Sequence, residues 1–162
     1  MTPDQFRKIM SQFATGITIV TASTDEGAAY GVTVNSFASV SLDPLLVLIC
    51  LDNRLSGFQA FKVGRVFGVS VLSESQEHVS KYFAQRGLDK SKAEYATGET
   101  GVPLVSGALA HLECEIVAAH PGGDHTIFVG QVKAGQVTPG AGDKGPLLYF
   151  RSQYTRLSKA NE

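Results

Sequence analysis

The sequence has few cysteines, no excess of charge and no long apolar run. Cys50 and Cys114 are its only cysteines and form no Cys-x-x-Cys pair, so we expect reduced thiols in the cytoplasm. Fourteen basic and fifteen acidic side chains give a net charge of -1, which argues against a nucleic-acid partner. No apolar run approaches the ~18 residues of a membrane-spanning helix, and the charged N-terminus is typical neither of a signal peptide nor of a membrane anchor.

The length of 162 residues fits one domain, covering residues 1–162. Short runs that are rich in β-branched residues and bounded by turn residues predict six strands. These runs lie at residues 17–22, 45–51, 66–72, 109–117, 126–137 and 147–150. Three predicted helices do not alternate with the strands. We therefore expect a mainly β fold, an antiparallel barrel rather than a doubly wound sheet.

The three helices begin with the same pattern, a Ser or Thr followed three residues later by Gln, which is typical of a capping box. The first helix follows Thr2 and is amphipathic, and we expect it to dock through an apolar face made of Phe6, Ile9, Met10 and Phe13. The second is a short helix over residues 56–61. The third begins at Ser73.

The third helix is expected to direct Val79 and Phe83 inward and to end near Gly87. The segment 86–100 that follows is rich in charged residues, among them Lys90. We expect it to be a mobile excursion on the surface, of the kind that often covers a functional site.

Some residues match functional patterns only superficially. Residues 140–145 fit G-x-G-x-x-G, but Pro146 and a strand follow where a dinucleotide site needs a helix, so we expect a hairpin loop. The four histidines and two cysteines show no metal-ligand spacing, and we expect no metal. We expect His78 on a helix surface, His111 in a strand and Cys50 as a buried, inert thiol.

The stretch from Asp52 to Gly57 follows a strand and combines a guanidinium, a hydroxyl and a predicted helix start. Free N–H groups and the positive end of a helix dipole favour an anion, so Arg54 and Ser56 are candidate phosphate ligands. The alternative is that Ser56 only caps the helix and that Arg54 is solvated.

The stretch from Gly122 to His125 combines two glycines with a carboxylate and an imidazole at the start of a strand. Glycines let the backbone approach a ligand closely, and a histidine beside Asp124 can orient or polarise it. The alternative is a plain turn with a polar exit.

Five strings stand out when they are taken in order along the chain: Phe13–Ala22, Gly31–Pro44, Val71–Ser73 with Gln76, Gly123–His125 and Pro146–Arg151. The most specific are the Asn-Ser-Phe…Ser-Leu-Asp-Pro stretch and the downstream Gly-Asp-His. In this order the strings resemble the flavin reductase family of short-chain, split-barrel enzymes, and the resemblance covers nearly the whole chain.

That resemblance implies a homodimer of FMN-binding split β-barrels with Greek-key-like connections. The flavin ring would lie against Thr33, Val34, Asn35 and Ser36. The flavin phosphate would be held by Cys50, Leu51, Asp52, Asn53, Arg54, Ser56 and Gly57. Further flavin contacts would come from Phe83 and Arg86. The nicotinamide side would be formed by Asp124 and by His125, the catalytic candidate, which would orient the nicotinamide without an obligatory proton transfer.

The implied activity is hydride transfer from NADH (or NADPH) to FMN (or FAD), with the reduced flavin passing to a separate monooxygenase. Neither a membrane nor a nucleic acid is implied as a partner. Two other functions stay open, a flavoprotein that keeps its FMN and passes electrons to a protein partner, and a non-catalytic flavin-binding sensor. Two departures from the family pattern affect loop shape and leave substrate detail open, Leu45 after Pro44 and Ser91 after Lys90.

Overall fold

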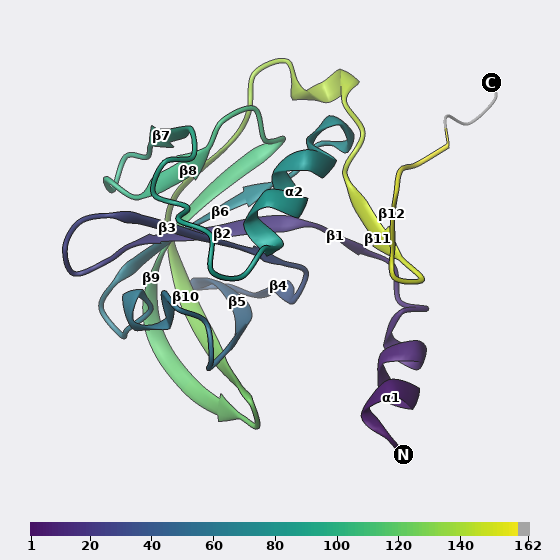
Figure 1. The fold of residues 1–162 in the computed structure, drawn as a ribbon. Coiled ribbons are helices and arrows are strands. Elements are labelled where there is room, and N and C mark those ends of the chain that lie inside the picture. Colours follow the sequence, from purple (N-terminus) through teal and green to yellow (C-terminus); the bar gives the residue numbers. More distant parts are fainter. Residues whose placement is uncertain (159–162) are drawn as a thin grey trace.

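The computed structural model describes residues 1–158, whose centre is a curled antiparallel sheet (Figure 1). The order in this sheet is β3-β2-β6-β9-β10-β5-β4, and every neighbouring pair is antiparallel. Its strands are β2 (Thr18–Ser23), β3 (Ala29–Val34), β4 (Phe37–Leu42), β5 (Leu45–Asp52), β6 (Val66–Val71), β9 (Ala110–Gly122) and β10 (His125–Val137). The predicted mainly β, antiparallel fold is confirmed.

One buried core collects side chains from strands that are far apart in the sheet. Val20 of β2, Val32 of β3, Ile49 of β5, Phe67 of β6 and Phe128 of β10 belong to the same cluster. Alternate residues of a strand point to opposite faces. Distant strands can therefore share this core only because the sheet curls around it.

Two smaller sheets complete the strand set. β1 (Thr15–Gly16), β11 (Leu148–Phe150) and β12 (Gln153–Thr155) form one, and β7 (Tyr95–Thr97) pairs with β8 (Pro103–Val105). β1, β3, β4, β7, β8 and β12 are not among the predicted strands. Most residues of β4 and β7 are partly or fully exposed, which leaves no apolar run to detect, whereas β8 is buried but is only three residues long.

Helix α2 (Glu77–Ala84) follows a 3-10 turn, η2 (Glu74–Gln76), and the capping box predicted at Ser73 is present. Phe83 points inward as predicted and is 2% exposed. The helix packs this closely on β3 because position 31 is a glycine, where an added Cβ would lie 2.5 Å from Phe83 Cε1.

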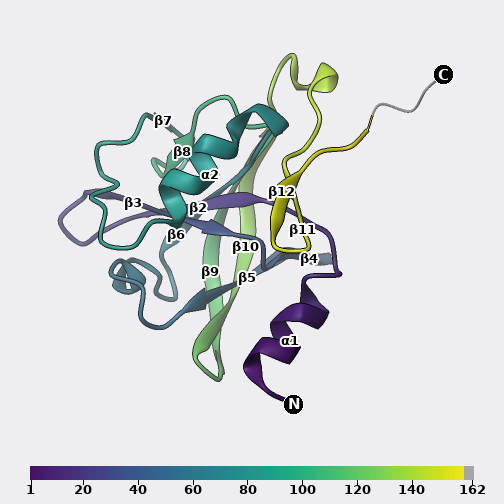
Figure 2. The ribbon, with the colours of Figure 1, turned by 45° about the vertical axis from the view of Figure 1, so that its right-hand side comes forward.

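Helix α1 (Pro3–Met10) begins with the predicted capping box at Thr2, but its predicted docking is wrong within this chain. No residue of α1 is buried, and the helix stands away from the main sheet in both views (Figure 2). Its end is held by the β11–β12 turn, where the Arg151 N–H donates to Ser11 O at 2.7 Å and Arg151 Nε donates to Gln12 Oε1 at 3.1 Å. The apolar face remains exposed: Phe6, Ile9, Met10 and Phe13.

Three other local predictions were wrong. Residues 56–61 contain only a three-residue 3-10 turn, η1 (Phe58–Ala60), without a side-chain cap. The segment 86–100 is not wholly a surface excursion, because it contains β7 and because Lys90 is 7% exposed. The loop at residues 140–145, which contains η3 (Ala141–Asp143), joins β10 to β11 in a different sheet and is not a hairpin.

The remaining placements agree with the sequence analysis apart from Cys50, which is only half-buried in β5. His78 is exposed on α2 and His111 is buried in β9. No helix within residues 1–158 has both the length and the apolar character that a membrane span requires.

Candidate functional site

Two adjoining cavities lie beside the C-terminal half of α2, and Thr33 and Ala84 line both of them. The first, the basic cavity, has a volume of about 300 Å³, and its polar lining includes Arg54, Ser56, Arg86 and Lys90. The second, the tyrosine cavity, has a volume of about 210 Å³ and is lined by Ile17, Asn35, Tyr149 and Tyr154 in addition to the shared pair. Together they form a site with a cationic part and an aromatic part.

Thr33 is fixed between the two cavities by a chain of hydrogen bonds. Its hydroxyl donates to Ser80 O of α2 at 2.6 Å, and Ser80 Oγ is 2.9 Å from the Tyr154 hydroxyl. The Tyr154 ring meets the Tyr149 ring edge-on with centroids 5.4 Å apart. β3, α2 and β12 are therefore tied together at the tyrosine cavity.

Sequence reasoning missed Tyr149 and Tyr154 as site residues. Both follow Pro146 in the C-terminal part of the chain, where Tyr149 belongs to one of the family-like strings. Nothing local in the sequence shows that this hairpin returns to the end of β3.

Residues 34–36 and 50–51 are brought together by the Ser36 hydroxyl. Ser36 Oγ donates to Cys50 O at 2.8 Å and accepts from the Cys50 N–H at 3.2 Å, which ties the β3–β4 turn to β5. Val34 and Leu51 are buried in the core, so only their backbone atoms could face a cofactor. Asn35 is exposed and lines the tyrosine cavity. Among residues 34–36 and 50–51, its side chain is therefore the one available to a ligand in that cavity.

Asp52 binds two guanidinium groups. Its carboxylate accepts from Arg54 Nε at 3.0 Å and Nη2 at 2.9 Å, from the Arg54 N–H at 2.9 Å, and from Arg86 Nη2 at 3.1 Å. Hydrogen bonding from Arg54 holds the pKa of Asp52 far below its usual range. Arg54 and Arg86 therefore share one carboxylate at the rim of the basic cavity.

The physical basis predicted for a phosphate site at residues 52–57 was wrong. The three-residue turn η1 supplies no helix dipole of useful length, and Ser56 forms no cap. Gly57 lacks a side chain because the Tyr30 ring occupies that space, where an added Cβ would lie 2.3 Å from Tyr30 Cδ2. The alternative was wrong for Ser56, which caps nothing, whereas Arg54 is solvated as that alternative expected and is in addition ion-paired with Asp52.

His125 and Asp124 form a polar pair next to this cluster. His125 Nδ1 lies 2.7 Å from Asp124 Oδ1, and this hydrogen bond lowers the pKa of Asp124. The Asn53 N–H donates to Asp124 O at 3.0 Å, and His125 lies opposite Asp52 in the β10–β5 register. The structure thus brings the Gly-Asp-His turn against residues 52–54, although neither member of the pair is among the residues that line the two cavities.

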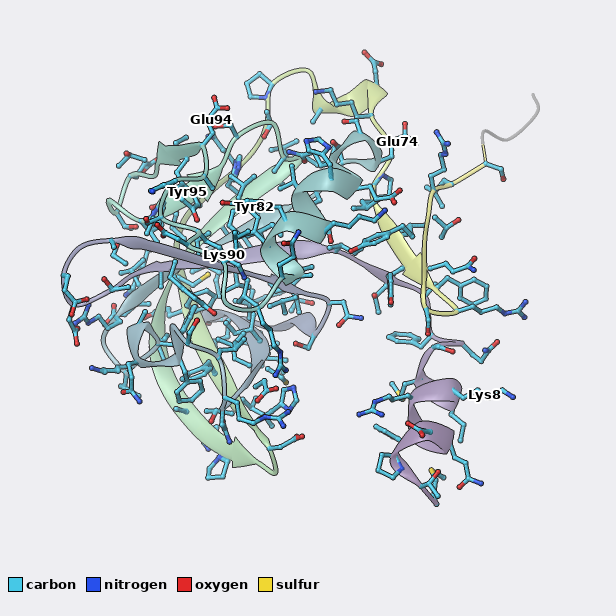
Figure 3. All side chains as sticks on the ribbon, in the orientation of Figure 1. Lys8, Glu74, Tyr82, Lys90, Glu94 and Tyr95 are labelled. Atoms are coloured by element: carbon cyan, nitrogen blue, oxygen red, sulfur yellow. The ribbon has the colours of Figure 1, made fainter. Side chains whose placement is uncertain are left out.

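Lys90 lies beneath α2 in the interior (Figure 3). Its ammonium donates to Phe83 O and lies 5.8 Å from the centre of the Tyr30 ring. Burial lowers the pKa of Lys90. Sequence reasoning missed this residue because it stands among charged, solvated neighbours.

Within residues 1–158 no group of three or more His, Cys, Asp or Glu side chains is arranged to hold a metal ion. The polar groups that line the two cavities are hydroxyls, guanidiniums, the amides of Asn35 and Gln85, and an ammonium. Such groups suit an organic ligand with an anionic end.

Comparison with known proteins identifies the family. Residues 10–158 match the flavin reductase like domain, and the chain belongs to this family. It is 38% identical over 159 residues to an NADH-dependent flavin reductase from a Rhodococcus species, covering 97% of this chain and 88% of that protein. It is 41% identical over 149 residues to the NADH-dependent flavin reductase StyB of Pseudomonas fluorescens, covering 92% and 86%.

A solved structure agrees with these relatives. The NADH:FAD oxidoreductase of Streptomyces globisporus, in complex with NAD and FAD fragments, superimposes with a TM-score of 0.88 at 37% identity. The match covers 98% of this chain and 94% of that one. The fold and the family are therefore the same over almost the entire length.

Proposed function

We infer that the protein is an NADH-dependent flavin reductase that supplies reduced flavin to a separate monooxygenase. The observation that carries this inference is the match of nearly the whole chain to reductases of this specificity. A relative from Rhodococcus jostii is named as the reductase subunit of a flavin-dependent monooxygenase. The curled sheet also suits the split-barrel arrangement that the family resemblance implies.

The residues of the two cavities fit a flavin. The tyrosine cavity offers aromatic rings and the Asn35 amide for a flat, polar-edged ring, and the basic cavity offers cations for its phosphate. When bound, the flavin accepts the hydride that the reduced nicotinamide gives up. The chain contributes the alignment of both molecules, which removes much of the entropic barrier of their encounter.

We assign His125 to orienting the nicotinamide, with Asp124 fixing its ring. In the neutral ring, Nδ1–H donates to the Asp124 carboxylate, which leaves Nε2 as an acceptor. The pair stands at the β9–β10 turn, next to the Asp52 cluster but outside the two cavities. This position suits a second molecule that approaches the bound flavin from outside.

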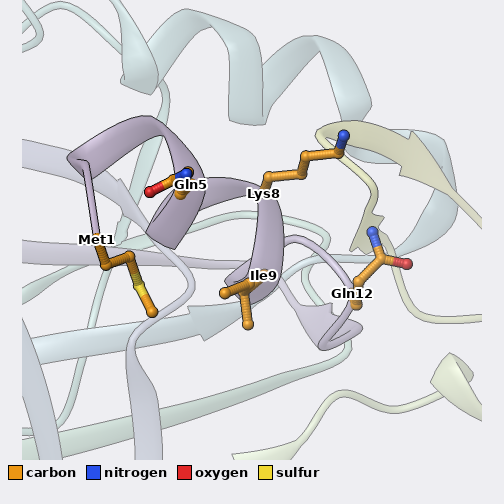
Figure 4. Close-up of a pocket in the computed structure, with 5 residues that line it drawn as sticks. All are labelled: Met1, Gln5, Lys8, Ile9 and Gln12. Carbon is orange, nitrogen blue, oxygen red and sulfur yellow. The ribbon is translucent and has the colours of Figure 1, made fainter.

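The exposed face of α1 supports a homodimer. Met1, Gln5, Lys8, Ile9 and Gln12 border an open hollow of about 660 Å³ along one side of the helix (Figure 4). Within residues 1–158 no other element closes this hollow. A second copy of the chain can cover both the hollow and the apolar side chains, which a helix on its own leaves in water. The two free cysteines support a reducing compartment, and we place the protein in the cytoplasm.

The test is a turnover assay with the purified protein, excess free FMN and NADH, followed at the absorbance band of the reduced nicotinamide. A reductase oxidises NADH over many turnovers of added flavin, and FAD and NADPH in parallel assays define the preferred pair. A single stoichiometric reduction would instead indicate a carrier with resident FMN. Absence of NADH oxidation would indicate a flavin-binding sensor.

A further inference from the structure

The turn that carries His125 is short and exposed. Gly123 and Asp124 alone connect β9 to β10, and the side chains of Asp124 and His125 are 74% and 43% exposed. The hydrogen bond within this pair orients the ring relative to Asp124 but not relative to the rest of the molecule. A group that orients a ligand needs support from its neighbours, since a misplacement of about 1 Å can cost about a hundredfold in rate.

Asn53 binds this turn on both sides of His125. Its N–H donates to the backbone oxygen of Asp124, the preceding residue, at 3.0 Å. Its side-chain Oδ1 accepts from the hydroxyl of Thr126, the following residue, at 2.8 Å. Among the described residues, 1–158, no other side chain outside the turn forms a hydrogen bond with residues 123–126. Asn53 is therefore the residue that supports His125 from the body of the protein.

The residue before Asn53 belongs to the rim of the basic cavity. Asp52 binds two guanidinium groups there and lies opposite His125 in the β10–β5 register. His125 lowers the pKa of Asp124 most, and the charge of Arg54 lowers it further, so the two turns are close enough to interact electrostatically. The position of Asn53 thus sets where His125 lies relative to a ligand in the basic cavity.

Resting on the proposed function, we propose that Asn53 is a positioning residue, which holds His125 in place for the nicotinamide through its bonds to Asp124 and Thr126. This role differs from the flavin contact that the family resemblance implies for Asn53, because its N–H and its amide oxygen are already bound to the turn. Asn53 acts on NADH only through His125. Its removal loosens the turn without detaching it, since the backbone bond to Asp124 does not depend on the side chain.

The test measures the KM for NADH at saturating FMN, and FMN affinity by quenching of flavin fluorescence. Asn53→Ala and Thr126→Val each remove the same side-chain bond and should raise this KM by about three- to tenfold, with FMN affinity within about twofold. Thr126→Ser keeps the hydroxyl and should restore the KM. The matched control is Thr24→Val, which removes a hydrogen bond from the Ala28 N–H at 3.2 Å in the β2–β3 turn and should change neither quantity. An unchanged KM, or an equal loss of FMN affinity, overturns the proposal.

Two double-mutant cycles separate positioning from a general structural effect. Asn53→Ala combined with Thr126→Val should raise the KM no more than either change alone, because both remove one bond. In a His125→Ala background, Asn53→Ala should leave the KM unchanged, because the residue that it positions is absent. Effects that multiply in either cycle overturn the proposal. Turnover of NADH and added FMN by the unaltered protein tests the proposed function separately, since it does not depend on any of these variants.

Discussion

Replacing two exposed apolar side chains, Ile9 of α1 and Phe13 in the turn that follows it, should separate the proposed dimer into protomers. Phe13 is 69% exposed and Ile9 is 55% exposed, although both are large and apolar. Full burial of such a side chain stabilises a structure by roughly 1.5–3 kcal/mol, so covering the exposed part of this pair is worth about 2–4 kcal/mol per helix. Both helices contribute in a two-fold symmetric dimer. The double variant Ile9→Ser, Phe13→Ser should therefore raise the dimer dissociation constant by about three to six powers of ten.

Analytical ultracentrifugation at micromolar concentration measures this change. The unaltered protein should sediment as a dimer, and the variant as a protomer of 17.2 kDa. The matched control is Val63→Ser, because Val63 is 62% exposed but lies outside the N-terminal segment that contains Ile9 and Phe13. Circular dichroism should show no loss of structure, since neither side chain is buried within the protomer. A variant that stays dimeric, or an unaltered protein that is fully active as a protomer, refutes the reasoning.

Three further predictions concern single side chains. His125→Ala should raise the KM for NADH about tenfold with flavin affinity unchanged in a fluorescence titration, and an equal loss of flavin affinity would move this turn to the flavin. Burial acts to raise the pKa of Glu113, but hydrogen bonds from residues 99–100 outweigh it and lower the pKa. Its stabilising contribution is therefore fully present above the ordinary pKa of 4.5 and is lost as the pH falls through the lowered one. Glu113→Gln should lower the free energy of unfolding at pH 7 by about 2–3 kcal/mol, and the free energy of unfolding of the variant should fall less on acidification than that of the unaltered protein. Urea denaturation at pH 7 and at a pH below the ordinary pKa of 4.5 measures both effects. Tyr154→Phe removes the bond to Ser80 and should weaken FMN and riboflavin by the same few-fold factor, whereas a change in FMN alone would place the phosphate in the tyrosine cavity.

The strands of the main sheet could be predicted because their signal is local. Residues 17–22, 45–51 and 66–72 are short β-branched runs, and each corresponds to an observed strand. The edge strand β4 gave no such signal, because an edge strand with exposed side chains contains little apolar sequence. Strands could thus be predicted from the sequence where burial requires a continuous run of apolar, β-branched residues.

The site could be predicted only in part, because its contacts join residues far apart in the chain. The Asp52–Arg54 pair lies within one turn, but the second guanidinium comes from Arg86. Lys90 stands in a charged segment that suggests a solvated surface, yet the fold buries it against Tyr30. A run of charged residues predicts solvent exposure for the segment as a whole, but tertiary packing determines whether a single side chain within it is buried.

The three capping-box patterns show how packing overrules a local motif. Thr2 and Ser73 form the predicted boxes, but Ser56 does not, although Gln59 stands at the right spacing. A capping box needs at least a turn of helix after it, and here Phe58 and Phe61 are drawn instead against Phe128, with ring centroids 5.8 and 6.1 Å apart. Burial of two aromatic rings is worth several kcal/mol, whereas a cap is worth about 1 kcal/mol. Packing of these rings therefore limits the helical turn to three residues. The anion site expected at residues 52–57 consequently has no helix N-terminus to support it.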